Sequence, residues 1–204
     1  MRVRKRESPE QRKSQIIAAA DYVLLEVGID RFTVDQVIAR AGIAKGTVYR
    51  YYKNKDEMLA ELCGKALQLL LETFTKATEA VPSYIDKIKA ICHSHYDYTR
   101  TYPAYSDLIS YMERPEFDIH IQSYLNISYA ITDYVVKMVR EGQEAGEIKK
   151  DLDPHVLTYV AWATNVGVVQ FVETKKHMLK NHHEITTKQL VSAFADMLTE
   201  GIRP

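Results

Sequence analysis

The residues whose types and spacing could do chemistry gather between Thr33 and Lys55. Two short helical patterns lie there, separated by Gly42-Ile43-Ala44, which is the spacing of a helix-turn-helix. Gly42 can adopt the left-handed backbone that ends the first helix, and Ile43 can fill the corner between the two. The segment therefore predicts a compact corner that presents one side of its second helix to solvent.

The second of these helices has the sequence Lys45-Gly46-Thr47-Val48-Tyr49-Arg50-Tyr51, in which only Val48 has to face a core. The remaining side chains suit the major groove of DNA, because Lys or Arg reaches guanine O6 and N7 and a Thr methyl meets the thymine methyl. Tyrosine hydroxyls and Lys55 can hold phosphates, as can the amino end of the helix that starts at Thr33. The alternative interpretation is an ordinary solvated corner of a helical bundle.

The charge of the chain is divided unevenly along its 204 residues. It holds 27 Lys+Arg and 27 Asp+Glu, so its formal net charge is zero. Residues 1–55 carry 12 basic and 6 acidic side chains, a net of +6, which leaves 15 basic and 21 acidic ones, a net of −6, for the rest. A basic module joined to an acidic one favours a nucleic-acid partner for the first module.

Composition excludes several other classes of protein. Eight glycines and six prolines are too few turn signals for an all-β sandwich or barrel. Two cysteines, Cys63 and Cys92, cannot make a disulfide framework, which favours a reduced, cytoplasmic setting. The basic start is not followed by the apolar run of a signal peptide. The uncharged stretch Val156–Val172 contains polar residues and is shorter than the ~20 residues of a membrane span, so we expect a buried or interface helix there.

Helical periodicity and capping residues predict an all-α fold of about nine helices. Ser8-Pro9-Glu10-Gln11 and Thr33-Val34-Asp35-Gln36 are capping boxes that open the first two, and Gly28 and Gly42 end them. Beyond the helix-turn-helix, the pattern predicts helices at Asn54–Glu79, near 83–101, 104–112 and 116–144, from Asp153-Pro154 to about Lys176, and from Ile185 or Thr187 to Gly201.

At the helix-turn-helix residues between Thr33 and Lys55 described above, the sequence resembles the tetracycline-repressor (TetR) family of bacterial transcription regulators. The resemblance is confined to roughly residues 10–60, while the rest agrees only in length and in its all-helical pattern. Ala44 departs from the family, which often has Ser there, so one polar contact at the turn is expected to be absent. Tyr51-Tyr52 stands where Tyr-Phe is commoner, so Tyr52 is expected in the core with its hydroxyl at the margin. The matching residues are Gly28, Phe32-Thr33-Val34, Val37 to Ile43, Lys45 to Tyr52, Lys53 to Glu57 and Leu59.

The resemblance implies two domains. Residues 1–55 would form a three-helix, helix-turn-helix DNA-binding domain, in which residues 1–8 are a disordered tail. Residues 56–204 would form a helical bundle that binds an effector and dimerises. The basic residues Arg2, Arg4, Lys5 and Arg6 could reach an adjacent minor groove, or serve only as a solubilising tail.

The resemblance also assigns roles to single residues of the helix-turn-helix. Thr33, Tyr49 and Lys55 would contact phosphates. Lys45, Thr47 and Arg50 would face base edges, with Gly46 and Tyr51 close to the DNA backbone.

The uncharged helix near 154–176 and the last helix near 187–200 are the candidate dimer interface. Small residues on the first, Ala161, Ala163 and Gly167, would allow a second copy to approach closely. The last helix contributes Leu190, Val191, Phe194, Met197 and Leu198. The alternative is that both helices pack inside the monomer.

A small-molecule site is expected in the second domain, because tyrosine is abundant (14 of 204 residues) and most tyrosines lie between Tyr84 and Tyr134. A cavity lined by such groups would suit an aromatic or amphipathic effector. The alternative is that these side chains belong to the core and the surface. The candidate lining residues are His95, Thr99, Tyr105, Tyr124, Ser128, Trp162 and Asn165.

Metal binding and catalysis are not expected. Cys92-His93-Ser94-His95 resembles a ligand cluster, with His177, His182 and His183 as a second group, but no paired set of four ligands is visible. No catalytic triad order, Gly-rich phosphate loop or CxxC motif occurs. We therefore expect neither an enzyme nor a bound cofactor.

Together these observations predict a repressor that binds a palindromic operator as a homodimer and that an effector releases. Coupling would pass through the helix Asn54–Glu79. The alternative is an architectural DNA-binding protein that has no small-molecule inducer.

Overall fold

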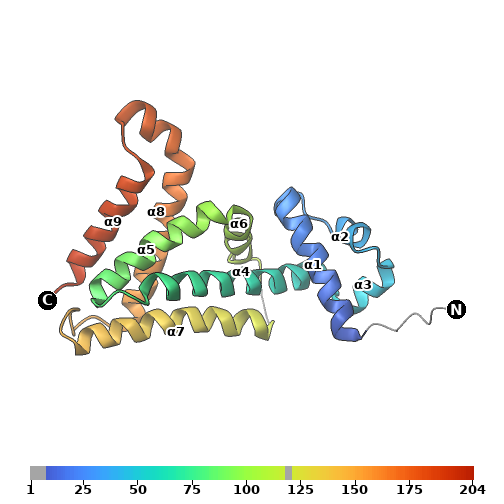
Figure 1. The fold of residues 1–204 in the computed structure, drawn as a ribbon, viewed down its shortest axis with the longest axis horizontal. Helices are drawn as coiled ribbons and strands as arrows, with labels where there is room; N and C mark the ends of the chain where they lie inside the picture. The colour runs from blue at the N-terminus through green and yellow to red at the C-terminus, as the bar shows by residue number, and fades with distance from the viewer. Residues whose placement is uncertain (1–7, 118–120) are drawn as a thin grey trace. The chain divides into compact units, whose positions relative to one another are not determined.

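The computed structural model describes residues 8–117 and 121–204. Within these residues the chain forms nine helices and no strand, which confirms the all-α prediction (Figure 1). The basic residues Arg2, Arg4, Lys5 and Arg6 lie outside the described residues. The helices are α1 (Pro9–Val27), α2 (Val34–Ala41), α3 (Lys45–Tyr51), α4 (Lys55–Thr78), α5 (Tyr84–Thr101), α6 (Pro103–Met112), α7 (Gln122–Glu144), α8 (Pro154–His183) and α9 (Thr187–Ile202).

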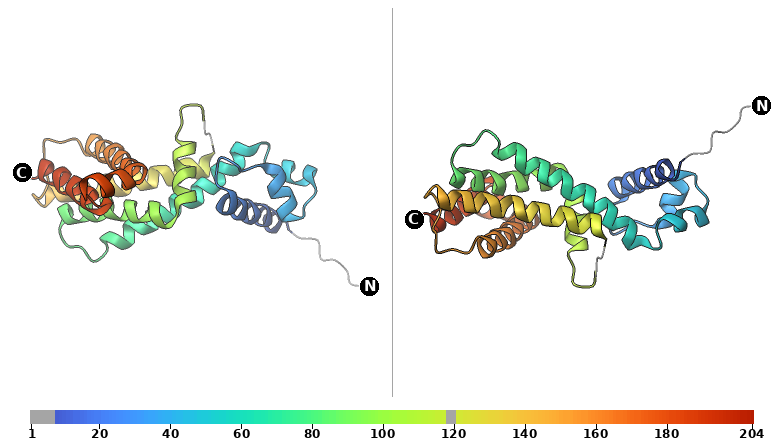
Figure 2. Two further views of the ribbon diagram at one scale, coloured as in Figure 1. Left: turned by 90° about the horizontal axis from the view of Figure 1, so that it is seen from above. Right: turned by 90° about the horizontal axis from the view of Figure 1, so that it is seen from below.

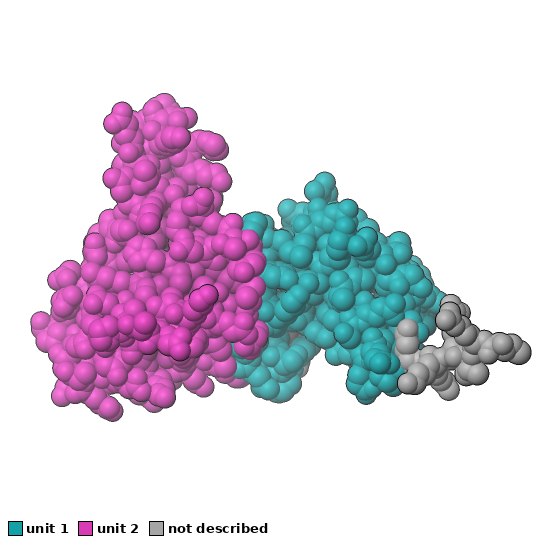
Figure 3. Space-filling view, in the orientation of Figure 1, with its two compact units in different colours: residues 1–67, 103–127 teal, residues 68–102, 128–204 magenta. Residues whose placement is uncertain are grey.

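The chain divides into two compact units (Figure 3). Unit 1 comprises residues 1–67 and 103–127, and unit 2 comprises residues 68–102 and 128–204. Helices α4 and α7 therefore contribute residues to both units, and α6 belongs to unit 1 together with α1, α2 and α3. The functional boundary predicted after residue 55 stays a prediction.

Local capping chemistry sets where several helices begin. Ser8, Thr33 and Thr186 each form a complete capping box with a glutamine three residues later. The Asp153 carboxylate accepts hydrogen bonds from the backbone N–H groups of His155 and Val156, both at 2.9 Å, and these bonds lower its pKa. These groups satisfy N–H donors that the first turn of a helix leaves unpaired, which is why the sequence predicts the helix starts well.

Two helix boundaries differ from the prediction. Helix α8 continues to His183 instead of ending near Lys176, because its last turn carries Lys180, His182 and His183, which complement the helix dipole. The helix predicted near 116–144 begins only at Gln122. Before it, the backbone turns with a Phe117 N–H to Arg114 O bond, and the Phe117 ring lies 4.9 Å from that of Tyr111.

Unit 2 is built around the packing of α5, α8 and α9 (Figure 2). Tyr96, Val169, Val172 and Val191 form a buried cluster at their contact. Val191, a residue that the sequence suggested for the dimer interface, is therefore part of the core of unit 2. The Tyr96 hydroxyl shares a hydrogen bond with the hydroxyl of Thr187, so the cluster also has a polar tie to the start of α9.

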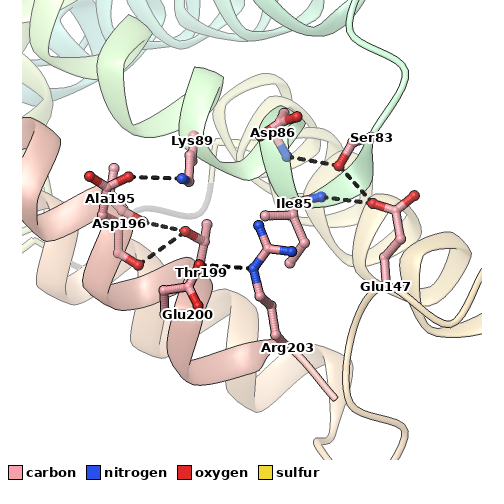
Figure 4. A network of polar contacts seen from close by, with 10 residues as sticks. All are labelled: Ser83, Ile85, Asp86, Lys89, Glu147, Ala195, Asp196, Thr199, Glu200 and Arg203. Atoms are coloured by element: carbon pink, nitrogen blue, oxygen red, sulfur yellow. Dashed lines mark hydrogen bonds and ion pairs between the residues drawn. The ribbon is translucent and has the colours of Figure 1, made fainter.

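The start of α5 is held by the connection between α7 and α8 (Figure 4). The Glu147 carboxylate accepts hydrogen bonds from the Ser83 hydroxyl at 2.7 Å and from the Tyr84 N–H at 2.8 Å. The Ser83 bond is the largest cause of the lowered pKa of Glu147. Nearby, Lys89 of α5 forms a 2.8 Å ion pair with Asp196 of α9.

Gly142 allows the close approach on which this connection depends. A Cβ placed there would lie 2.6 Å from Ile148 Cδ1 and 2.9 Å from Tyr84 Cβ. In contrast, a Cβ at Gly64 in α4 would meet nothing within 4 Å. Gly142 and Gly64 are thus a matched pair: neighbouring side chains occupy the position of a Cβ at Gly142 but not at Gly64.

We predict that Gly142→Ala lowers the free energy of unfolding by about 1–3 kcal/mol, because the added methyl group forces Ile148 and Tyr84 apart. Gly64→Ala should raise it by about 0.5–1 kcal/mol, because alanine is the better helix former. Urea denaturation of both variants measures the difference. Equal effects of the two substitutions would contradict the close packing at Gly142.

Candidate nucleic-acid interface

Helices α2 and α3 form the predicted helix-turn-helix. Val37, Ile43 and Val48 are buried, and they anchor the two helices and the corner between them. Gly42 has φ 63° and ψ 30°, the left-handed conformation that its role as a helix end requires, and its N–H bonds to Ile38 O at 3.1 Å. The inward side of α3 is thus confined to Val48, as predicted.

The other side of α3 is open to solvent. Lys45, Gly46, Tyr49 and Arg50 are exposed, and Thr47 is half-buried. A Cβ at Gly46 would meet nothing within 4 Å, so no neighbour inside unit 1 requires glycine there. This absence of side chain leaves the backbone of α3 accessible to a large partner.

The start of α3 lacks a side-chain cap. Ala44 is its N-cap residue and makes no side-chain capping hydrogen bond. The Lys45 ammonium instead reaches back to the Asp35 carboxylate in the first turn of α2, at 3.1 Å. This hydrogen bond raises the pKa of Lys45. Sequence reasoning missed Asp35, although an acidic residue in the first turn of a helix is an ordinary signal.

Aromatic rings lie beside the cations of this surface. The Lys45 ammonium is 5.9 Å from the centroid of the Tyr49 ring, and the Arg50 guanidinium is 5.5 Å from that of Tyr51. Such cation–π contacts are worth about 0.5–1 kcal/mol at exposed sites, enough to bias the direction of long side chains. The cations are therefore oriented along the exposed side of α3 and stay free to exchange partners.

Two further residues of the predicted interface flank α3. The Thr33 hydroxyl accepts a 3.3 Å bond from the Gln36 N–H and donates to Gln36 Oε1 at 2.9 Å, so it caps α2. Lys55, the first residue of α4, has its ammonium 5.7 Å from the ring centroids of both Phe32 and Tyr111. Tyr111 belongs to α6, far along the sequence, so no local pattern could reveal it.

Tyr52 departs from its predicted position. It is in the core as expected, at 3% exposure, but its hydroxyl is also enclosed and makes no well-aligned hydrogen bond among the described residues, with the Glu61 carboxylate as its nearby polar group. Burial is the main cause of the raised pKa of Tyr52, and the nearby Glu61 carboxylate adds to it. The ammonium of Lys13 lies 5.7 Å from the Tyr52 ring. The prediction of a marginal hydroxyl is therefore wrong, because the hydroxyl is buried beside Glu61 of α4.

Four of the seven predicted effector residues occur together in unit 2. Asn165 Nδ2 and His95 Nδ1 lie 3.2 Å apart, the Trp162 and His95 ring centroids 5.7 Å apart, and the Thr99 hydroxyl donates to His95 O at 3.1 Å. Phe74, which sequence reasoning missed, lies edge-on to His95 and Trp162 at 6.5 and 6.4 Å.

The other three predicted effector residues lie elsewhere. Tyr105 is in unit 1, where its hydroxyl donates to Asp21 Oδ1 at 2.7 Å beside the ion pair between Asp21 and Lys65. Tyr124 is in the part of α7 that belongs to unit 1, and Ser128 is the first residue of α7 in unit 2. Their proposed role in effector binding is untested.

Burial governs the ionisable groups near the four effector residues. It lowers the pKa of His95 to about 4, so the imidazole is neutral near pH 7, and it raises the pKa of the Cys92 thiol to about 12. Among residues 8–117 and 121–204, no group of three or more His, Cys, Asp and Glu side chains could hold a metal ion. No helix in the described part of the chain is long and apolar enough to cross a membrane.

We predict that Tyr52→Phe raises the free energy of unfolding by about 1 kcal/mol, because it removes a buried hydroxyl that makes no well-aligned hydrogen bond. Tyr96→Phe is the matched control, since Tyr96 is equally buried but its hydroxyl is hydrogen-bonded, and that variant should lose about 1 kcal/mol. Thermal and urea denaturation measure both. Similar losses in the two variants would contradict an enclosed hydroxyl without a well-aligned hydrogen bond.

Comparison with known proteins shows where the chain has relatives. Residues 16–62 match the family model for bacterial regulatory proteins of the tetR family. The fatty acid metabolism regulator protein of Bacillus subtilis is 23% identical over 189 residues, which cover 92% of this chain and 94% of that protein.

Solved structures have the same fold over the whole chain. A protein with unknown function from Rhodococcus sp. RHA1 has a TM-score of 0.77 at 19% identity and covers all of both chains. The transcriptional regulator FadR from Bacillus subtilis, solved in complex with stearoyl-CoA, has a TM-score of 0.71 at 21% identity, covering 94% of this chain and all of that one. At these identities the likeness shows the fold alone.

Proposed function

We propose that this chain, whose residues 16–62 match the family model for bacterial regulatory proteins of the tetR family, is a repressor that binds a palindromic operator as a homodimer. It is a DNA-binding regulator that responds to a ligand, and in this proposal the ligand releases it from DNA. The observation that carries the proposal is the outer side of α3, where two cations, a tyrosine and a glycine are exposed and a threonine is half-buried, opposite a single buried valine.

The chemistry of that side supports direct reading of bases in the major groove. Lys45 and Arg50 carry donors that match guanine O6 and N7, and the methyl of Thr47 matches that of thymine. Thr33, Tyr49 and Lys55 would bind phosphates, while Gly46 and Tyr51 lie close to the DNA backbone. Lys45 would have to give up its hydrogen bond with the Asp35 carboxylate before it could reach a base edge. Asp35 therefore lowers the affinity of the protein for DNA of any sequence.

An exposed apolar side of α8 and α9 supports dimerisation. Val156, Tyr159 and Val160 are 61%, 58% and 51% exposed on α8, and Met197 is 76% exposed on α9. Ala163 and Gly167 are also exposed on α8, where their small size allows a second helix to approach. A two-fold dimer would place two copies of α3 about 34–36 Å apart, one turn of DNA, which is why the operator is a palindrome.

The residues around His95 support an effector site. Phe74, Trp162 and His95 supply rings, and Asn165 and Thr99 supply polar groups, a combination that suits an aromatic or amphipathic compound. Phe74 is on α4, whose first residue is Lys55, so one continuous helix joins the effector site to the DNA-contacting residues. An effector that prefers a different position of α4 would weaken DNA binding, and DNA would weaken effector binding by the same factor.

We predict two classes of effect on DNA binding. Lys55→Ala and Tyr49→Phe should weaken binding to all sequences alike, and Lys55→Ala should reduce the salt dependence by about one phosphate contact. Lys45→Ala and Arg50→Ala should each cost about 1–3 kcal/mol at the base pair they contact and relax the preference there. Fluorescence anisotropy with duplexes that the wild-type chain selects from a random pool measures both.

The control for these DNA-binding variants is Lys150→Ala, which removes the same charge from an exposed position in unit 2. It should leave both affinity and base preference unchanged. Failure of the wild-type chain to select any sequence, or an equal loss in Lys150→Ala, would contradict DNA recognition by α3.

We predict that Val160→Glu makes the chain monomeric, because the two-fold axis would bring two copies of an unpaired carboxylate into an apolar contact, at a cost of about 3 kcal/mol or more. Sedimentation velocity measures the change. Leu25→Glu is the control, since Leu25 is 55% exposed on α1, outside the proposed interface, and that variant should remain a dimer. A dimeric Val160→Glu protein would place the interface elsewhere.

An architectural DNA-binding protein without an inducer is the competing function. It predicts that no aromatic or amphipathic compound releases the chain from its selected duplex. Stearoyl-CoA is a suitable first probe, because it is amphipathic and occupies the similarly folded FadR regulator from Bacillus subtilis. Release by any such compound favours the repressor.

A further inference from the structure

The carboxamide of Asn165 is buried in unit 2 with only one of its two ends paired. Asn165 is 4% exposed and His95 is 7% exposed, and the Asn165 Nδ2 lies 3.2 Å from His95 Nδ1. Asn165 Oδ1 is also buried, and no donor among the described residues bonds to it. A strong acceptor is thus held without a partner in the protein interior.

An unpaired buried acceptor is uncommon, because more than about nine in ten buried polar groups are hydrogen-bonded in folded proteins. Its surroundings give no structural reason for it. The rings of Phe74 and Trp162 both pack against His95. Neither ring places a hydrogen-bond donor within reach of Asn165 Oδ1. Asn165 therefore has a protein partner at its nitrogen end only.

We propose that Asn165 Oδ1 accepts a hydrogen bond from the effector, which is therefore a neutral compound bearing a hydroxyl or N–H group on an aromatic or amphipathic body. This inference rests on the proposed function only in that unit 2 binds an effector. It adds that the effector carries a hydrogen-bond donor, because Asn165 Oδ1 can only accept a hydrogen bond.

The neighbouring groups support a neutral donor over an anion. The Nδ1 of His95 accepts from Asn165, so the neutral imidazole carries its proton on Nε2. Burial keeps the pKa of His95 well below neutrality, at about 4, so the ring supplies no positive charge. A carboxylate placed here would face the Asn165 oxygen and lose its hydration without gaining a cation.

Trp162 is an intrinsic fluorescent probe of the site. It is the single tryptophan in the chain, its ring lies 5.7 Å from that of His95, and it is half-buried, so a bound compound has to displace or contact it. Fluorescence of Trp162 therefore reports binding beside Asn165 independently of any DNA measurement.

The test compares two pairs of compounds on the full-length wild-type chain: 1-dodecanol with its methyl ether, and 4-nonylphenol with its methyl ether, together with dodecanoate. Trp162 fluorescence measures binding, and anisotropy of the selected duplex measures release. We expect at least one alcohol or phenol to bind about tenfold more tightly than its ether, the worth of one buried hydrogen bond, and more tightly than dodecanoate. Equal affinities within both pairs, tighter binding of dodecanoate, or no response to any compound would overturn the proposal.

Asn165→Leu tests the atom directly, because it should abolish the difference in affinity within the responding pair. Thr158→Val is the matched control on the same helix: Thr158 is buried too, but its hydroxyl is satisfied by Pro154 O at 2.7 Å, so the tenfold difference should persist. If Asn165→Leu does not fold, the double variant with His95→Phe replaces both partners by apolar groups and gives the same readout. If the tenfold difference persists in Asn165→Leu, or in the double variant that replaces it, the assignment is overturned.

The two proposals fail separately in this experiment. A difference in Trp162 fluorescence without any DNA binding would refute the repressor and support the Asn165 site. Release of the duplex by stearoyl-CoA, with no preference for a hydroxyl in either pair, would support the repressor and refute the Asn165 site.

Discussion

The burial of one valine, Val48, is the interaction on which the position of the candidate DNA-binding helix α3 depends. A seven-residue helix such as α3 is too short to be stable by itself in water, so packing must hold it. Val48, Val37 and Ile43 supply that packing, and Gly42 supplies the turn that brings α2 and α3 together. Because Val48 is the single fully buried residue of α3, Lys45, Tyr49 and Arg50 stay exposed for a partner.

Unit 2 shows the complementary arrangement on a much longer helix. Helix α8 has one side in the core, with Val169 and Val172 in the buried cluster, and another side on which Val156 and Val160 are exposed. An uncharged helix with two apolar sides explains why the sequence suggested either burial or an interface. Asn165 lies on the buried side, where its unpaired oxygen is a cost to stability that a bound donor would offset.

Features encoded by neighbouring residues were predictable, and features that depend on distant residues were not. Capping boxes at Ser8 and Thr33 and the left-handed Gly42 follow from local chemistry, and all three occur as predicted. The Tyr52 hydroxyl, the Tyr111 contact with Lys55 and the Asn165–His95 pair depend on helices far apart in the sequence. Periodicity identifies which side of a helix is apolar, but it does not identify which polar atom loses its partner.

Methylation interference on the selected duplex tests most directly whether α3 enters the major groove. Guanine N7 faces that groove, and adenine N3 faces the minor groove. We predict that methylation of N7 at guanines in both half-sites, about one helical turn apart, blocks binding, while methylation of adenine N3 at A·T pairs in the same half-sites does not. Interference confined to adenine N3, or none at guanine N7, would contradict it.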